Sequence, residues 1–262
     1  MIDTHCHLNL DPLQQDWQKY LHQAQLAGVT KIIIPGVDQL TSQTAINIAS
    51  KSESCFAAVG IHPHEAEKIL TDGTNLNQIF NSFIAYCQQK QAIAIGECGL
   101  DYFNLPQDPL KQKHIKAAQK KLFLLHLEAA QKAQVSILVH IRDAHDDALD
   151  LITQFSLPTV LHCFSGTADF LTKALKQNCY ISFAGNLTFN NAKDLQSVLL
   201  QIPLDKLLIE TDSPYLNPIR GVFPNQPQNI TTIYTFIANK LSLSLEELQQ
   251  QIAQNVHTLF GV

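Results

Sequence analysis

Ala92–Glu97 reads Ala-Ile-Ala-Ile-Gly-Glu and Ser136–Ile141 reads Ser-Ile-Leu-Val-His-Ile, and these two segments with the chain between them indicate the fold class. Each segment is a short apolar run of strand length, whereas the intervening Leu110–Ala133 is amphipathic and long enough for a helix. Strands that alternate with helices form βαβ units, in which the strands are parallel. This part of the chain therefore predicts an α/β fold with a parallel sheet.

The same alternation continues in both directions along the chain. Eight apolar segments recur, each followed by a stretch with helical character: Met1–His7, Lys31–Val37, Cys55–Ile61, Ala92–Glu97, Ser136–Ile141, Thr159–Cys163, Cys179–Ala184 and Leu207–Thr211. Eight units without a linker predict a single-domain (β/α)8 TIM-like barrel over residues 1–262. A doubly wound open sheet is the alternative, although it usually has fewer strands. The capping box Ser244-Leu245-Glu246-Glu247 predicts a last helix that runs to about Phe260.

Composition narrows the class of protein. Hydrophobic residues make up 45% of the 262 residues and charged residues 16%, which supports a full core and argues against disorder. The six cysteines are scattered without a CxxC pair, and no signal pattern or membrane-length apolar run is visible, so we expect a cytoplasmic protein. The net charge of −5 gives no general attraction to nucleic acid. DNA or RNA would have to bind in a local cleft, with help from metal ions.

Six residues of metal-binding type share one structural position. Each lies at or just past the carboxyl end of a predicted strand: His5, His7, Glu97, His140, His162 and Asp212. The carboxyl ends of the strands form the face on which (β/α)8 barrels build their active sites. The pattern predicts that these six side chains meet in one metal site.

The first two histidines form a His5-Cys6-His7 pair. Alternate residues of a strand point to the same side, so both imidazoles can enter the barrel while Cys6 faces the helices. By the same alternation we expect Cys98 and Cys163 to point away from their ligand neighbours into the core. The alternative for the pair is two hydrogen-bonded histidines at a strand end.

Glu97 is a carboxylate at the end of an apolar strand, where burial is costly unless the group is paired or bound to a metal. Its two oxygens can bridge cations about 3.5–4 Å apart, the spacing of two-metal sites. The flanking glycines allow substrate or backbone to approach closely. A structural, salt-bridged glutamate is the alternative.

The remaining candidates complete a set of nitrogen and oxygen ligands. His140 and His162 are single histidines on apolar strands, so each by itself also fits a hydrogen-bonded core histidine. Asp212 is suited to bind a metal and to accept a proton from an activated water. Glu210 shares its parity and is expected in a deeper layer, as a structural residue or as support for a ligand. Without thiolates, this set favours two divalent ions such as Zn, Mg or Mn (Fe is also possible), and it favours hydrolysis.

Seven motifs carry a family resemblance over essentially the whole chain. They are Ile-Asp-Thr-His-Cys-His (2–7), Gly-Ile-His-Pro-His (60–64), Gly-Glu-Cys-Gly-Leu-Asp-Tyr (96–102), His-Ile-Arg-Asp-Ala (140–144), His-Cys-Phe-Ser-Gly (162–166), Glu-Thr-Asp-Ser-Pro-Tyr-Leu (210–216) and Asn-Val-His-Thr-Leu-Phe (255–260). In this order they resemble the TatD-type metal-dependent deoxyribonucleases of the amidohydrolase superfamily. Many relatives in that superfamily bridge their metals with a carbamylated lysine on strand four; Glu97 on this strand favours the TatD branch.

The resemblance implies a two-metal enzyme that hydrolyses phosphodiesters and trims DNA from a 3′ end. One metal would be held by His5, His7, Glu97 and Asp212, and the other by Glu97, His140 and His162, with Asp212 and Glu97 as the catalytic residues. The expected partner is a single strand or 3′ end of DNA, with no membrane and no stable protein partner, so that the protein is a monomer.

Three further residues are predicted to contact the substrate. His62 and His64 follow the third strand on the active face, and the alternative for them is simple loop packing. Arg142 shares the parity of His140 and can reach the mouth of the cleft as a phosphate clamp; the alternative is a salt bridge with Asp143 or Asp146.

The sequence departs from its family in one loop. The family commonly has Arg-Gly-Lys-Arg-Asn-Glu-Pro, whereas Arg220–Pro227 reads Arg-Gly-Val-Phe-Pro-Asn-Gln-Pro. We expect this loop to border the cleft, where Phe223 would stack on a base or pack within the loop. The competing function is an ester or amide hydrolase with the same metals, for example one that removes D-amino acids from tRNA. A non-catalytic metal-binding or adaptor protein fits the intact ligand set poorly.

Overall fold

The computed structural model describes all 262 residues, and its centre is one sheet of eight parallel strands in sequence order. The strands are β1 (Ile2–Asp3), β2 (Lys31–Pro35), β3 (Cys55–Val59), β4 (Ala92–Asp101), β5 (Ser136–Arg142), β6 (Thr159–Leu161), β7 (Tyr180–Phe183) and β8 (Leu207–Ile209). Every neighbouring pair is parallel. The predicted TIM-like α/β barrel is confirmed.

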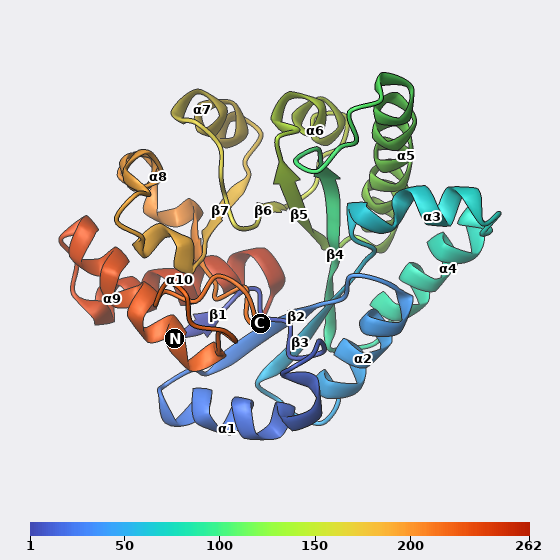
Figure 1. Ribbon diagram of the computed structural model, residues 1–262. Helices are drawn as coiled ribbons and strands as arrows, with labels where there is room; N and C mark the ends of the chain where they lie inside the picture. Colours follow the sequence, from blue (N-terminus) through green and yellow to red (C-terminus); the bar gives the residue numbers. More distant parts are fainter.

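Ten α-helices surround the strands, as Figure 1 shows. They are α1 (Trp17–Leu26), α2 (Gln39–Ala49), α3 (Ala66–Thr71), α4 (Leu76–Cys87), α5 (Pro109–Ala133), α6 (His145–Ile152), α7 (Ala168–Lys176), α8 (Lys193–Leu199), α9 (Ile230–Leu241) and α10 (Leu245–Phe260). Helix α10 begins at the predicted capping box, in which the Ser244 hydroxyl accepts from Glu247 N and the Glu247 carboxylate accepts from Ser244 N. Short 3₁₀ turns complete the connections, including η2 (Pro63–Glu65) after β3.

The barrel closes where the first and last strands meet. The strand β1 has only two residues, and the chain beyond it bonds both to β2, where Cys6 N donates to Ile33 O at 3.0 Å, and to the segment after β8. Thr4 N donates to Ile209 O at 3.2 Å, Asp212 N donates to His5 O at 2.9 Å, and His7 N donates to Ser213 O at 2.7 Å. These bonds bring the first predicted ligands beside the last one.

Apolar residues fill both sides of the barrel wall. The core is one cluster of 67 buried hydrophobic residues. Ile32, Ile33 and Ile34 are consecutive and all fully buried, because one face of a parallel strand meets the barrel interior and the other meets the helices. The strands therefore appear in the sequence as continuous apolar runs. All six cysteines are free thiols.

Strand β4 is longer than the sequence predicts. Glu97 was expected at its end, but the strand continues to Asp101 past a register shift between Ile95 and Cys98. Gly96 and Gly99 have φ of +139° and +133°, and a Cβ on either would collide with the backbone of β5. The predicted close approach at the flanking glycines is thus made by the neighbouring strand. The extension lifts Asp101 to the rim of the barrel.

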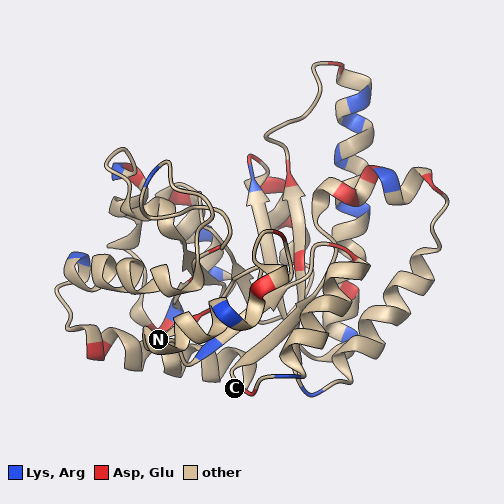
Figure 2. Ribbon diagram, turned by 60° about the horizontal axis from the view of Figure 1, so that its bottom comes forward, with Lys and Arg blue, Asp and Glu red and all other residues tan.

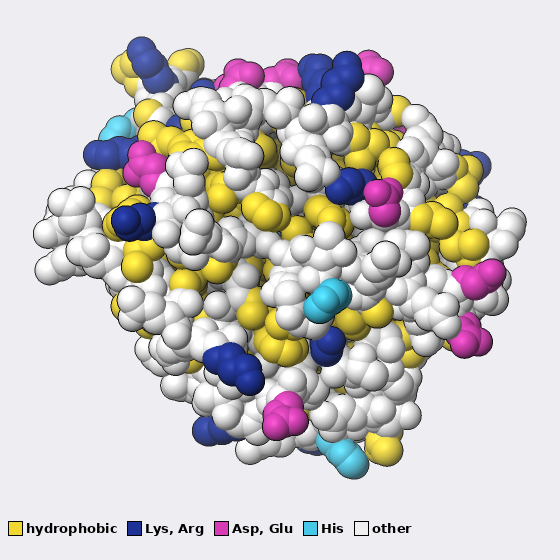
Figure 3. Space-filling view, turned by 180° about the vertical axis from the view of Figure 1, so that it is seen from behind, with side chains coloured by type: hydrophobic (Ala, Val, Ile, Leu, Met, Phe, Trp, Pro, Cys, Tyr) yellow, Lys and Arg dark blue, Asp and Glu magenta, His cyan; other side chains and the backbone are white.

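Charge is dispersed over the outer surface. Figure 2 shows basic and acidic residues scattered over the ribbon, and Figure 3 shows both signs interspersed with hydrophobic side chains on the face opposite that of Figure 1. No helix is both long enough and apolar enough to span a membrane. Any attraction for an anionic ligand must therefore arise inside a local site.

Candidate metal centre

A cavity of about 610 Å³ opens at the carboxyl ends of the strands. Its wall includes eight of the nine predicted site residues: His7, His62, His64, Glu97, His140, Arg142, His162 and Asp212. The ninth, His5, is fully buried behind the wall, with its Nε2 3.4 Å from Glu97 Oε2. The structure thus brings together all nine residues, which come from six of the strands or from the segments that directly follow them.

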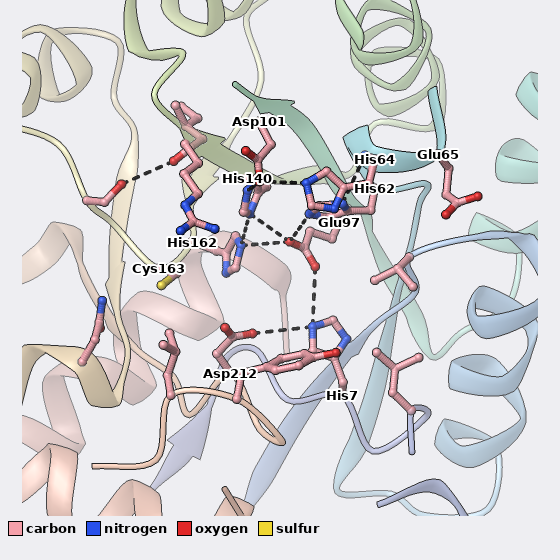
Figure 4. Close-up of a pocket in the computed structure, with 18 of the residues that line it drawn as sticks. His7, His62, His64, Glu65, Glu97, Asp101, His140, His162, Cys163 and Asp212 are labelled. Carbon is pink, nitrogen blue, oxygen red and sulfur yellow. Dashed lines mark hydrogen bonds and ion pairs between the residues drawn. The ribbon is translucent and has the colours of Figure 1, made fainter. Parts of the chain in front are cut away.

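Glu97 lies at the centre of the group, as Figure 4 shows. Its Oε2 lies 3.4 Å from His5 Nε2 and 3.5 Å from His7 Nε2. Its Oε1 lies 3.0 Å from His162 Nε2 and 3.2 Å from His140 Nδ1. Each oxygen of one carboxylate therefore meets a separate pair of histidines, which is the arrangement that a bridging ligand needs.

On the Oε2 side, two imidazoles and a second carboxylate converge. The Nε2 atoms of His5 and His7 are 3.2 Å apart, and they lie 3.6 and 3.5 Å from Asp212 Oδ1. Nδ1 of His7 faces Pro35 O at 3.3 Å, so a proton on Nδ1 leaves the Nε2 lone pair directed into the group. Both imidazole nitrogens thus lie within 3.6 Å of a carboxylate oxygen of Glu97 and of one of Asp212.

On the Oε1 side, two further imidazoles are held from behind. Nδ1 of His140 and Nε2 of His162 are 3.1 Å apart, beside Glu97 Oε1. Nε2 of His140 lies 3.2 Å from Asp101 Oδ2, and Nδ1 of His162 lies 3.2 Å from Glu210 Oε1. Protons on these outer nitrogens leave both inner lone pairs free for a cation. His62 approaches the same oxygen, with its Nε2 at 3.5 Å.

Two carboxylates hold the metal-facing histidines from behind, and the sequence predicted a position for only one of them, Glu210. The deeper position expected for Glu210 is confirmed: it is fully buried, and it also accepts from Cys163 N at 2.8 Å and Ser182 Oγ at 2.5 Å. Asp101 was assigned no role, yet its Oδ2 also lies 3.0 Å from His64 Nε2. Its even spacing from Glu97 along the strand was the signal that could have identified it.

Cys163 corrects one expectation from strand alternation. It was predicted to point away from His162 into the core, but it lines the cavity. Strand β6 ends at Leu161, and Cys163 has a left-handed φ of +44°, so the two-residue alternation no longer applies there. Burial, with help from Asp212 and Glu210, raises the pKa of the Cys163 thiol well above its usual range. The thiol therefore stays protonated. Cys6 and Cys98 are buried in the core as expected.

Arg142 lies at the rim of the cavity without an acidic partner. The alternative of a salt bridge to Asp143 or Asp146 is not realised, since Asp146 pairs with Lys173 at 3.3 Å and no ion pair involves Arg142. Its guanidinium instead lies over the ring of Phe103, with Cζ 3.5 Å from the ring centroid. An unpaired guanidinium at a cavity mouth can bind an anionic ligand.

The loop that departs from the family pattern contributes less to the cavity than expected. Tyr215 and Leu216 line the wall, but no residue of Arg220–Pro227 does. Asn225 ties this segment back, because its N donates to Pro214 O at 2.8 Å and its Nδ2 to Thr211 O at 2.9 Å. Phe223 is 66% exposed outside the wall.

The carboxylates of the site are ionised at neutral pH. Burial would raise the pKa of Glu97, but the charge of His162 and the hydrogen bonds from His140 and His162 hold that pKa well below its usual range. Burial is likewise outweighed at Asp212, where His7, His5 and His162 lower the pKa. Burial lowers the pKa of His62 to about 3, so this imidazole is neutral. Against the effect of burial, the carboxylates Glu97 and Glu210 raise the pKa of His162 well above its usual range, so a cation that binds there must displace a proton from this imidazole.

These donors suit a metal on each side of Glu97. Groups with metal-binding spacing include the buried His5, His7 and Glu97 on one side, and Glu97 with the partly buried His62 and His140 on the other. A third grouping, His5 with His162 and Glu210, is less suitable, since Glu210 already accepts three hydrogen bonds. Mixed imidazole and carboxylate ligands are typical of catalytic sites for Zn or Mn.

Comparisons with known proteins also support a metal site. The profile of the family described as "TatD related DNase" matches residues 2–261. The chain is 30% identical over 267 residues to the metal-dependent hydrolase YabD of Bacillus subtilis, covering 100% of this chain and 99% of that protein. It is also 30% identical over 275 residues to the 3′-5′ ssDNA/RNA exonuclease TatD of Citrobacter koseri, covering 100% and 99%. The crystal structure of YJJV, a TatD homologue from Escherichia coli, superposes with a TM-score of 0.88 at 28% identity, covering 100% and 98%.

Proposed function

Because the chain belongs to the TatD-related DNase family and is a metal-dependent hydrolase, we propose that it is a two-metal deoxyribonuclease that removes nucleotides from the 3′ end of a DNA strand. The observation that carries this proposal is the position of Glu97, each of whose carboxylate oxygens meets a separate histidine pair. The similar exonuclease of Citrobacter koseri, which acts on ssDNA and RNA by its name, supports the choice of substrate.

The ligands divide between two cations. His5, His7, Glu97 and Asp212 would hold the first, and Glu97, His140 and His162 the second, with His62 close enough to join it. Two divalent cations there would polarise the phosphodiester, lower the pKa of the attacking water and offset charge on the leaving oxygen. His62 was predicted to contact the substrate, but its approach to Glu97 favours a place beside the second cation.

The chain's own residues supply the remaining chemistry. Asp212 is ionised and borders the cavity, so it can accept the proton of the attacking water as the new oxygen–phosphorus bond forms and the bond from phosphorus to the leaving oxygen breaks. Arg142 can hold a non-bridging phosphate oxygen, and His64, paired to Asp101, can hold another. Glu210 and Asp101 orient the rings of His162 and His140, so that the other nitrogen of each ring faces Glu97.

The shape and charge of the molecule favour the end of a strand as substrate. The cavity is concave and local, whereas the net charge is −5 and the surface charges are mixed. A long duplex would gain little from such a surface, because non-specific binding to DNA depends on many basic contacts with phosphates. A single 3′ end needs only the cations and a few clamps.

A substrate panel tests the proposal. We expect metal-loaded protein to shorten single-stranded DNA from a free 3′ end, one nucleotide at a time, with less activity on duplex DNA or a blocked 3′ end. Product ladders on denaturing gels measure this, with RNA and D-aminoacyl-tRNA in parallel. Hydrolysis of the tRNA ester without cleavage of DNA would contradict the proposal and favour the competing ester hydrolase.

Glu210→Ala is expected to weaken the second cation selectively. Removal of the carboxylate that orients His162 should lower the affinity for that cation about 10–100-fold, the range typical for loss of such a partner. Calorimetric titration of metal-free protein with Mn²⁺ or Zn²⁺ measures both sites. Glu210→Gln keeps an acceptor oxygen and should recover most of the affinity. Equal loss at both sites in a protein with an intact melting curve would contradict the division of ligands.

A further inference from the structure

A cation and an aromatic ring form an exposed stack at the rim of the cavity. The Arg142 guanidinium carbon lies 3.5 Å from the centroid of the Phe103 ring. Phe103 is 53% exposed, although an aromatic ring gains by burial. Arg142 lines the cavity wall and has no carboxylate partner, while Phe103 lies just outside that wall. One face of the ring is therefore covered by a guanidinium, and much of the side chain is open to solvent.

The stack is fixed to the strands that carry the metal centre. Asp101 of β4 pairs with Arg142 of β5 in the sheet, and Tyr102 N donates to Arg142 O at 2.8 Å. Phe103 N donates to Asp101 Oδ1 at 3.0 Å, and the other oxygen of Asp101 contacts His140. Arg142 follows His140 by two residues, a rise of roughly 6–7 Å along a strand. The stack therefore lies close above the second side of the centre.

Exposure alone would not distinguish Phe103 from other surface residues, since single exposed hydrophobic side chains are common. The distinguishing features are the orientation imposed by the guanidinium and the position at the rim. Aromatic rings bind unpaired bases by stacking, and a stacked arginine adds a cation–π contribution. A ring held beside a phosphate-binding arginine can receive the base next to that phosphate.

We propose that Phe103, held beneath the Arg142 guanidinium, is a stacking site for an unpaired nucleobase whose strand enters the metal centre. This inference rests on the proposed nuclease function and deepens it, because it assigns a base-binding position to the single-stranded 3′ end. Phe103 is a binding residue and takes no part in the reaction itself. Because every base has a flat face, the site accepts all four bases and gives little sequence preference.

Steady-state kinetics on single-stranded oligonucleotides test the assignment. Phe103→Ala is expected to raise KM about tenfold, the loss that corresponds to one stacked base, while kcat changes little. Phe103→Trp should restore KM, because it keeps an aromatic face. Phe103→Leu should not, although it keeps an apolar side chain. Leu26→Ala, an exposed hydrophobic residue at the end of α1, is the matched control.

An oligonucleotide with abasic positions at its 3′ end links the effect to the base. Wild-type protein should bind it more weakly, and Phe103→Ala should add no further loss, since residue and base belong to one interaction. Three results overturn the assignment: full activity of Phe103→Leu, an equal loss on the abasic strand, or a loss produced by Phe223→Ala in place of Phe103→Ala.

A binding measurement separates this inference from the proposed function. Fluorescence anisotropy of the intact oligonucleotide on metal-loaded Asp212→Asn reports Kd without cleavage. Binding that depends on Phe103 in a protein whose wild type cleaves no DNA would overturn the nuclease and keep the stacking site. Cleavage that is independent of Phe103 would do the reverse. Absence of both binding and cleavage overturns both.

Discussion

Glu97→Ala is expected to reduce hydrolysis by about a thousandfold or more and to lower the bound metal from two ions per chain to fewer than one. Both carboxylate oxygens are used, Oε2 beside His5 and His7 and Oε1 beside His140 and His162. Loss of both cations removes several kcal/mol of transition-state stabilisation, and each 1.36 kcal/mol corresponds to about tenfold in rate. Elemental analysis and initial rates on one preparation measure the two effects.

Two variants serve as controls for Glu97→Ala: the same substitution at an exposed glutamate, and a conservative substitution at Glu97. Glu128→Ala removes an exposed carboxylate from α5 and should alter neither the metal content nor the rate. Glu97→Gln keeps one oxygen but replaces the other with an amide nitrogen, which cannot bind a cation, so one ion should be retained. Circular dichroism establishes that each variant is folded. Two ions per chain in folded Glu97→Ala would show that Glu97 is not the bridge.

Asp212→Asn is expected to lower kcat by about 10²–10⁴-fold, the range for removal of a general base. The amide keeps an oxygen near His5 and His7, so most of the first cation should remain. The pKa of Asp212 is held below its usual range, so the wild type already has its base ionised at neutral pH. Wild-type kcat should therefore be nearly flat from about pH 6 to 8. The variant should gain about tenfold per pH unit there, as hydroxide replaces the missing base.

Two results would contradict the role of Asp212 as the general base. If activity and metal are lost together, Asp212 acts only as a ligand. If the variant has the flat pH profile of the wild type, the proton is accepted elsewhere. Asp194→Asn changes an exposed aspartate of α8 and is the matched control for both measurements.

Much of the site followed from sequence because strand periodicity is a local property. Apolar runs located the eight strands, and two-residue alternation placed His5 and His7 on one side and Glu210 below Asp212. Asp101 was missed because β4 was expected to end at Glu97. The register shift and the two left-handed glycines that extend the strand depend on contact with β5.

Where the chain leaves regular strand geometry, expectations from alternation were less reliable. Cys163 was placed in the core but lines the cavity, because its backbone turns left-handed just after β6. The segment Arg220–Pro227 was expected beside the cleft, but Asn225 bonds it back to Thr211 and Pro214. Hydrogen bonds between residues far apart in the sequence have no periodic signature in it.

Local sequence patterns were enough to predict the barrel and the residue types at its carboxyl edge, since the period of apolar residues and the order of the strands are both visible along the chain. Which nitrogen faces Glu97 in His7, His140 and His162 is set by contacts that form when the chain folds. That choice depends on Pro35 behind His7, Asp101 behind His140 and Glu210 behind His162. Likewise, only the pairing of β4 with β5 places the Phe103 ring under Arg142. Hydrogen-bond partners from separate strands meet only when the sheet curves into a barrel and closes, so tautomer and orientation are properties of the assembled fold.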